Sequence, residues 1–298
     1  DTFSSRGLGD VYKRQALTNT LKLFELEKID RDIYAWSGSS VGFGRIFGGQ
    51  VMAQTLMAAY STVDKKRFAH SFHSYFLRPG DMNQKIIFDV DRIRDGSSFT
   101  TRRVRAIQNG EAIFNCSISF KVKEKGLTHQ LSMPKVPGPE GLESEWEMRN
   151  KLKSKIEKKY LPIWLREREI DMRQVDPVDL LNPQKSPPYK KTWIKPNGNL
   201  PKDQKIHQAL MLYVSDMGLL GTAVNPHGLN FMSKNFQGAS LDHAMWFHNN
   251  INFNNWHLYH IDSPVSGGAR GFSRGSIYTK SGRLVASTSQ EGLMRVWD

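Results

Sequence analysis

The sequence is poor in cysteine, since Cys116 is the single thiol among 298 residues. One thiol cannot form an intrachain disulfide or build a thiolate metal cluster, and such low cysteine use is typical of a reducing compartment. A cytoplasmic protein is therefore expected. The chain does not end in a Ser-Lys-Leu address, so a peroxisomal location is expected only if the native C-terminus is missing.

Long apolar runs are also absent. No stretch approaches the roughly 18 apolar residues that a membrane-spanning helix needs, so membrane insertion is not expected. The nine histidines show no H-E-x-x-H or similar spacing, and no metal site is predicted. Residues 1–15 (DTFSSRGLGDVYKRQ) have neither an apolar segment nor a clear periodicity, and they are predicted to be a non-native leader.

Acidic residues are scarce relative to basic ones: 29 Asp and Glu stand against 42 Lys and Arg, a formal net charge of +13. Lysine clusters at 151–159 and 185–195 hold part of the excess. No zinc-finger spacing, RNP-like strand or basic heptad region accompanies them, so nucleic acid is not expected as a partner. A basic surface would instead raise the local concentration of a small anionic ligand in a salt-dependent way.

The pattern of a helix followed by several strands occurs twice in the chain. Residues 49–60 are apolar on almost every side, which predicts a helix buried all round, and a second such helix is predicted from a cap at Asp203 to about Thr222. Strands are predicted after the first helix at 68–77, 85–93, 99–107 and 112–122, and after the second at 240–247, 257–261, 271–279 and 284–294.

Residue matches between the two parts support a repeat. The segment His73-Ser-Tyr-Phe76 corresponds to His243-Ala-Met-Trp246, and Arg102 corresponds to Arg274. A twice-repeated buried helix wrapped by a curved antiparallel sheet is an α+β double hotdog. The predicted division is an N-terminal hotdog at 16–128, a connector at 129–168 with some helix, about residues 143–169, and a C-terminal hotdog at 169–298 that carries the catalytic residues.

Four separate segments resemble the acyl-CoA thioesterase II family, with its bacterial members and their peroxisomal relatives. They are GRIFGGQVMAQTL at 44–56, FHSYFLRPGD at 72–81, LDHAMWFH at 241–248 and LVASTSQEGLMR at 284–295. The resemblance covers about residues 20–296. It implies hydrolysis of fatty acyl-CoA to free fatty acid and coenzyme A without a cofactor, in a homodimer or homotetramer.

Asp216 is the first candidate catalytic residue, because it lies inside the apolar run 210–220 of the second predicted helix. A buried carboxylate is costly unless it is hydrogen-bonded, and the residues alone leave a structural role open. The resemblance implies that Asp216, Ser240 and Gln290 position the attacking water. Relatives commonly have threonine in place of Ser240, but serine keeps the donor and the acceptor. Strand alternation places Gln290 on one face with Thr288.

The phosphates of coenzyme A require cations, and Arg270 and Arg274 are the predicted ligands. Other constellations are less convincing. Ser40 and Ser273 each lie in a G-x-S-x-G pattern, but no histidine follows Ser273, and Ser40 precedes the strands that a nucleophile elbow needs. His243 is expected on the opposite strand face from Ser240, and its counterpart in the first half favours a structural role.

Two alternatives to the thioesterase remain open. The first is a catalytically silent hotdog protein that binds acyl-CoA, and the second is a hotdog enoyl-CoA hydratase. Asn225-Pro-His227 is a partial match to the hydratase loop, but the Gly-Asp that should precede it is absent. The distinguishing observation is whether Asp216, Ser240 and Gln290 converge on one cavity.

Overall fold

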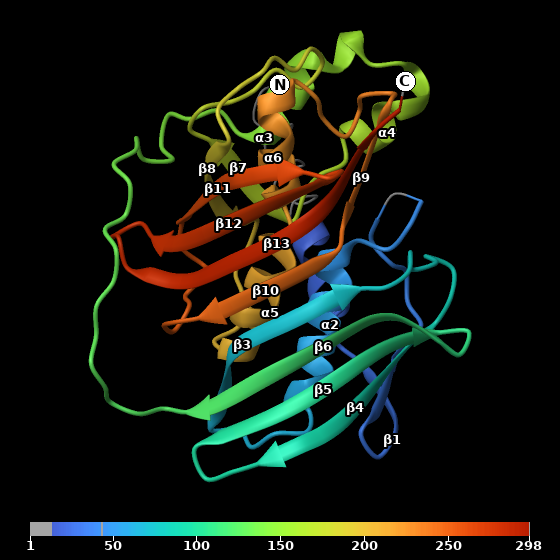
Figure 1. Ribbon diagram of the computed structural model, residues 1–298, viewed down its shortest axis with the longest axis vertical. Coiled ribbons are helices and arrows are strands. Elements are labelled where there is room, and N and C mark those ends of the chain that lie inside the picture. The colour runs from blue at the N-terminus through green and yellow to red at the C-terminus, as the bar shows by residue number, and fades with distance from the viewer. Residues whose placement is uncertain (1–13, 43, 298) are drawn as a thin grey trace, which may run out of the picture.

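The computed structural model describes residues 14–42 and 44–297, so most of the predicted leader lies outside the described residues. In this part of the chain the strands form one antiparallel sheet of thirteen strands, and its two halves meet where β3 pairs with β10. Figure 1 shows β3 to β6 of the first half, in cyan and green, below β10 to β13 of the second, in orange and red, with helices α2 and α5 behind the junction. The predicted α+β class is confirmed.

The predicted helix and four strands of the first half agree with the structure to within one or two residues, whereas the short strands β1 and β2 were not predicted. The Asn109-Gly110 turn that joins β5 to β6 has positive φ at both residues, 50° and 80°, as a tight hairpin requires. The elements are β1 (Glu27–Asp30), β2 (Ile33–Trp36), α2 (Gly48–Tyr60), β3 (Arg67–Phe76), β4 (Ile86–Asp95), β5 (Phe99–Gln108) and β6 (Glu111–Val122).

The second half differs from the prediction in three places, one of which is the strand predicted at 257–261, which extends to Gly267. The predicted helix to Thr222 is broken after Ser215, because Gly218 adopts a positive φ of 108° and starts a new helix. The predicted strand 240–247 is two strands. The elements are β7 (Ile170–Gln174), β8 (Tyr189–Pro196), α5 (Gln204–Ser215), α6 (Leu219–Val224), η3 (Asn225–His227), β9 (Phe236–Ser240), β10 (Asp242–Phe247), β11 (His257–Gly267), β12 (Arg270–Thr279) and β13 (Leu284–Val296).

The connector contains only short helical pieces, because its sequence is rich in lysine and poor in apolar periodicity. They are α3 (Glu145–Leu152), η1 (Lys153–Lys155), η2 (Lys158–Tyr160) and α4 (Leu161–Trp164). A capping box between Ser144 and Glu147 starts α3. None of the helices in the described part of the chain is long and apolar enough to cross a membrane. The division at residues 128 and 168 stays a prediction.

Helices α2 and α5 run antiparallel through the core, and glycine allows their close approach. A Cβ added to Gly49 would lie 2.2 Å from the backbone oxygen of Tyr213, so only glycine fits at this crossing. At the other end of the pair, the hydroxyl of Tyr60 donates a hydrogen bond to Gln208, whose amide reaches the backbone oxygen of Ala69 at 2.9 Å. The core therefore fixes one helix against the other at both ends.

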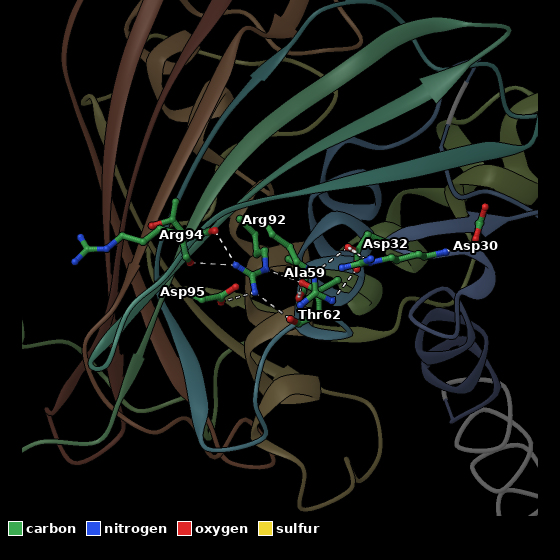
Figure 2. Close-up of polar contacts among 10 residues, drawn as sticks. Asp30, Asp32, Ala59, Thr62, Arg92, Arg94 and Asp95 are labelled. Atoms are coloured by element: carbon green, nitrogen blue, oxygen red, sulfur yellow. Dashed lines mark hydrogen bonds and ion pairs between the residues drawn. The ribbon is translucent and has the colours of Figure 1, made fainter.

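A buried arginine donates a hydrogen bond to a backbone oxygen just after the end of α2. Arg102 is 1% exposed, and its guanidinium donates to the hydroxyl and backbone oxygen of Thr62 and to the carboxylate of Asp95. Figure 2 shows Thr62 and Asp95 in this cluster, beside the ion pair between Arg92 and Asp32. A helix C-terminus leaves carbonyl groups without partners, and a cation there also matches the helix dipole.

We expect Gly49→Ala to lower the free energy of unfolding by about 1–3 kcal/mol, because the new methyl group forces α2 and α5 apart. Urea denaturation of both proteins measures the difference. Gly126→Ala is the matched control, since Gly126 has open space around it, and its effect should stay within about 0.5 kcal/mol. Equal midpoints for Gly49→Ala and wild type would contradict this account of the crossing.

Candidate active site

The three residues that the sequence predicts for catalysis lie together. The hydroxyl of Ser240 is 3.3 Å from Oδ1 of Asp216, and the side-chain amide of Gln290 donates to the same hydroxyl at 3.0 Å. Asp216 follows the last residue of α5, Ser240 ends β9, and Gln290 is on β13. The predicted alternation on β13 is confirmed, because Thr288 and Gln290 are 3% and 2% exposed.

The first half of the chain completes the site. The backbone N–H of Gly49, in the first turn of α2, donates to Oδ2 of Asp216 at 3.0 Å. The first N–H groups of a helix have no partner within the helix, and its positive dipole end favours a negative charge. Gly48 also requires the absence of a side chain, because its Cβ would lie 2.7 Å from Oδ2 of Asp216. The two glycines of this segment therefore bring α2 onto the carboxylate.

The surroundings of Asp216 bring the pKa of its carboxyl group close to neutral pH. Burial raises the pKa of Asp216 to about 6, although the donors from Ser240, Gly49 and Gln290 and the charge of Arg45 oppose this effect. A carboxyl group with this pKa is mostly ionised near neutral pH, and it takes up a proton readily. Such a group suits general-base catalysis, for which a pKa near the operating pH is optimal.

Asp216, Ser240 and Gln290 line a pocket of about 810 Å³ between the two halves. A pocket of this size accommodates a substantial organic ligand. Most of its wall is apolar and comes from both halves, including Ile46, Phe47, Phe76, Phe114, Met217, Leu220, Phe231 and Leu241. The predicted convergence of the three polar residues on one cavity is therefore observed, and their roles in catalysis stay a prediction.

A one-residue bulge corrects the expected orientation of His243. Ala244 is four positions after Ser240, but their partners on β13, Ser289 and Gly292, are only three positions apart. The extra residue interrupts the alternation, so Ser240 and His243 both approach the interior. The sequence suggested opposite faces because a bulge is a property of strand pairing, which a single strand does not reveal.

His243 contacts the site through Gln290. Its Nδ1 lies 2.7 Å from Oε1 of Gln290, and its Nε2 lies 2.9 Å from the hydroxyl of Ser215. Burial lowers the pKa of His243 to about 4, so the ring is neutral near neutral pH. His73, its counterpart by sequence, is exposed and packs edge-on against Trp246. The two histidines therefore have different environments.

Arg270 and Arg274 do not lie with the other site residues. Arg270 pairs with Glu291 at 3.1 Å, Arg274 pairs with Asp262 at 2.6 Å, and neither lines the pocket. Their role in binding coenzyme A stays a prediction. Two other arginines do line the pocket: Arg45, which donates to the backbone oxygen of Gly238 at 2.9 Å, and Arg78. Both lie in the segments that resemble the family, which was the signal available in the sequence.

Ser273 of the G-x-S-x-G pattern, His227 of the partial hydratase match and the single thiol of Cys116 do not line the pocket. The hydroxyl of Ser273 donates to the backbone oxygen of Leu219, and His227 contacts Ser266 rather than the pocket. Cys116 is 2% exposed, and burial raises its pKa to about 12. Among residues 14–42 and 44–297, no three His, Cys, Asp or Glu side chains group as a metal site would require.

Comparison with known proteins agrees with this geometry. The family model described as acyl-CoA thioesterase matches residues 166–293, and that described as acyl-CoA thioesterase N-terminal domain matches residues 37–121. The chain is 39% identical to acyl-CoA thioesterase 2 of Haemophilus influenzae, covering 94% of this chain and 98% of that protein. It is 37% identical to acyl-coenzyme A thioesterase 8 of Mus musculus, covering 97% and 96%.

Solved structures give the same result. The crystal structure of the acyl-CoA thioesterase II TesB2 from Mycobacterium marinum is 37% identical, with a TM-score of 0.76 over 94% of this chain and 99% of that one. A protein with a hot dog fold from Alicyclobacillus acidocaldarius, 15% identical, has a TM-score of 0.74 over 93% and 97%, which supports the predicted fold alone. Since models and relatives match both halves, the chain belongs to the acyl-CoA thioesterase family.

Proposed function

We propose that this protein hydrolyses fatty acyl-CoA to free fatty acid and coenzyme A, by direct attack of water on the thioester carbonyl. The observation that carries the proposal is the contact of Asp216, Ser240 and Gln290 within one apolar pocket. A thioesterase needs a base for water, donors for the developing oxyanion and a slot for the acyl chain. A protein that only bound acyl-CoA would need the slot but no partly buried base.

The proposed reaction begins with a water molecule held by Asp216 and Gln290. Asp216 accepts a proton from this water while the water oxygen forms a bond to the carbonyl carbon. The carbonyl oxygen becomes an oxyanion, and the positive end of α2 stabilises the added negative charge. The intermediate then expels the coenzyme A sulfur by breaking the carbon–sulfur bond, and Asp216 returns its proton to the thiolate. This cycle consumes one water and leaves the enzyme unchanged.

The proposed mechanism has no acyl-enzyme. Ser240 is the one hydroxyl in contact with Asp216 among the described residues, and it already accepts from Gln290 and donates to the carboxylate. A serine nucleophile is normally activated by a base that removes its proton, most often a histidine. The ring of His243 contacts Gln290 and Ser215 instead.

Arg45 and Arg78 would bind the phosphates of coenzyme A where they line the pocket, with the acyl chain against the apolar wall. The ion pairs of the described residues leave Arg45 without a carboxylate partner, whereas Arg78 pairs with the exposed Glu111. The basic net charge would assist arrival of the anionic substrate. A homodimer or homotetramer and a cytoplasmic location stay predictions.

Asp216→Asn should lower kcat by about 10²–10⁴-fold, because the amide cannot accept the proton of water. Release of free coenzyme A, followed with a thiol reagent over a series of acyl chain lengths, measures this. Asp242→Asn is a matched control, since its carboxylate accepts from the backbone of Glu291 and does not line the pocket. Wild-type turnover in Asp216→Asn, or an acyl adduct trapped by mass spectrometry, would contradict direct attack.

The pH dependence follows from the same carboxyl group. Because the ionised form is the base, kcat/KM should rise with pH through about 6 and then level off. The raised pKa has the opposite effect on stability. The neutral form is favoured in the folded state, so as pH rises from the ordinary value of 3.8 past about 6 the fold loses up to about 3 kcal/mol.

The neutral Asp216→Asn variant should therefore have a higher Tm than wild type above pH 6, with the difference shrinking as the pH is lowered. Thermal unfolding at several pH values measures this. An acid limb of kcat/KM that lies far below pH 6, or a Tm difference that grows towards low pH, would be inconsistent with a base of raised pKa.

The variant Arg45→Gln/Arg78→Gln should raise KM for acyl-CoA several-fold, since each exposed ionic contact contributes up to about 1 kcal/mol. The rise should shrink at high salt. The same acyl group on N-acetylcysteamine lacks the phosphates and should show no change. Arg103→Gln, which loses an exposed ion pair on β5, serves as the control. If Arg270→Gln/Arg274→Gln produces the larger KM change, the arginines predicted from the sequence bind the phosphates instead.

A further inference from the structure

We propose that His243 is a positioning residue for this reaction, because it holds the carboxamide of Gln290 with its NH2 group turned towards Ser240 and the attacking water. The proposal rests on the proposed function, in which Gln290 orients the water. It adds a residue that touches neither substrate nor water and acts through Gln290.

The contact between the ring and the amide selects one orientation of Gln290. Oε1 of Gln290 can only accept a hydrogen bond, so Nδ1 of His243, 2.7 Å away, must carry the ring hydrogen. If the amide were turned over, its NH2 group would face this N–H, and two donors would oppose each other. Both side chains are almost fully buried, at 1% and 2% exposed, so water cannot relieve such a mismatch.

The other ring nitrogen extends the chain of hydrogen bonds to Ser215. Burial keeps the ring neutral, so Nε2 carries no hydrogen when Nδ1 does, and it accepts from the hydroxyl of Ser215 at 2.9 Å. Each hydrogen bond in the series then has one donor and one acceptor, and the last acceptor is the ionised carboxylate of Asp216. The order is Ser215, His243, Gln290, Ser240, Asp216.

The opposite direction of the chain is less favourable for an ionised Asp216, because it removes one of the hydrogen-bond donors to the carboxylate. The hydroxyl of Ser215 has a second acceptor, the backbone oxygen of Leu212 at 2.8 Å. When Ser215 donates there, the ring hydrogen belongs on Nε2, and Gln290 turns its NH2 group towards the bare Nδ1. Ser240 then donates to Gln290, and the carboxylate loses a donor. One tautomer of His243 is therefore matched to the ionised base.

Two further ionisable groups near Asp216 bear on the pH dependence of the reaction. Arg45 favours the ionised carboxylate of Asp216 through its charge. Tyr259 stays a neutral phenol, since burial raises its pKa well above 10, and its hydroxyl is engaged with the backbone oxygen of Ser215 and with Thr288. The hydrogen bonds of the His243 ring go to Ser215 and Gln290, not to Arg45 or Tyr259. A substitution of His243 therefore leaves the contacts of Arg45 and Tyr259 unchanged.

The first experiment compares His243→Leu with His243→Asn, two side chains of nearly equal size. Asparagine can place an amide N–H near the position of Nδ1, whereas leucine has no donor. In His243→Leu we expect kcat to fall by about 10- to 100-fold with KM for acyl-CoA little changed, because the water loses its orientation. The acid limb of kcat/KM should move to higher pH, because Asp216 loses the donor that lowers its pKa.

His243→Asn should recover most of the lost kcat and return the acid limb to the wild-type position. His73→Leu is the control, because it changes the corresponding exposed histidine of the first half. In a Gln290→Leu background, His243→Leu should cause no further loss of kcat, since the amide it positions is gone. Equal losses in the leucine and asparagine variants, or an unmoved acid limb, would show a structural role and overturn the proposal.

The second experiment measures the tautomer of the His243 ring in the wild-type protein, so its result does not depend on how well a variant folds. The 15N shifts of the His243 ring in the wild-type protein, assigned by comparison with His243→Asn, should report hydrogen on Nδ1 and none on Nε2. Hydrogen on Nε2 would overturn the proposal. Because no substrate is present, the result is separate from the proposed function, whose failure would appear instead as full activity in Asp216→Asn.

Discussion

The site depends on the crossing of α2 and α5, where two glycines bring the first turn of one helix onto the carboxylate that follows the other. Gly49 has no Cβ, so the backbone oxygen of Tyr213 can lie 2.2 Å from the position that a Cβ would occupy. This close approach of the helices lets the N–H of Gly49 donate to Asp216 at 3.0 Å. One contact thus joins the packing of the core to the charge of the Asp216 carboxylate. It also means that neither half of the chain contains a complete site.

The repeat is symmetric in architecture but not in chemistry. At the Asp216 end of the helix pair there is a pocket, whereas at the opposite end Tyr60 and Gln208 fill the crossing with a buried hydrogen bond, and Arg102 satisfies the backbone beyond it. The first buried helix has no acid to place there, so this end contributes stability. One end of the helix crossing therefore serves packing, and the other holds the polar site.

The sequence predicts those features that depend on local patterns. Alternation over β3 to β6, β12 and β13 gives their positions within about two residues, and an acid inside an apolar helix identifies Asp216. Three features escape such reasoning, because they arise from contacts between distant segments. They are the break at Gly218, the register shift before Ala244 and the donation from Gly49 to Asp216. The family resemblance located Ser240 and Gln290, whose residue types alone are unremarkable.

The bulge between β9 and β10 has a consequence for how this site could have arisen or been lost. A deletion of one residue there would restore regular alternation between β9 and β10, so Ser240 and His243 would no longer both face the interior while each strand kept its pairing with β13. Insertions and deletions at this position would therefore change which side chains face the pocket while the sheet around it stays paired. The chain length between two strands, as well as the identity of the side chains, thus decides which groups meet at the candidate site.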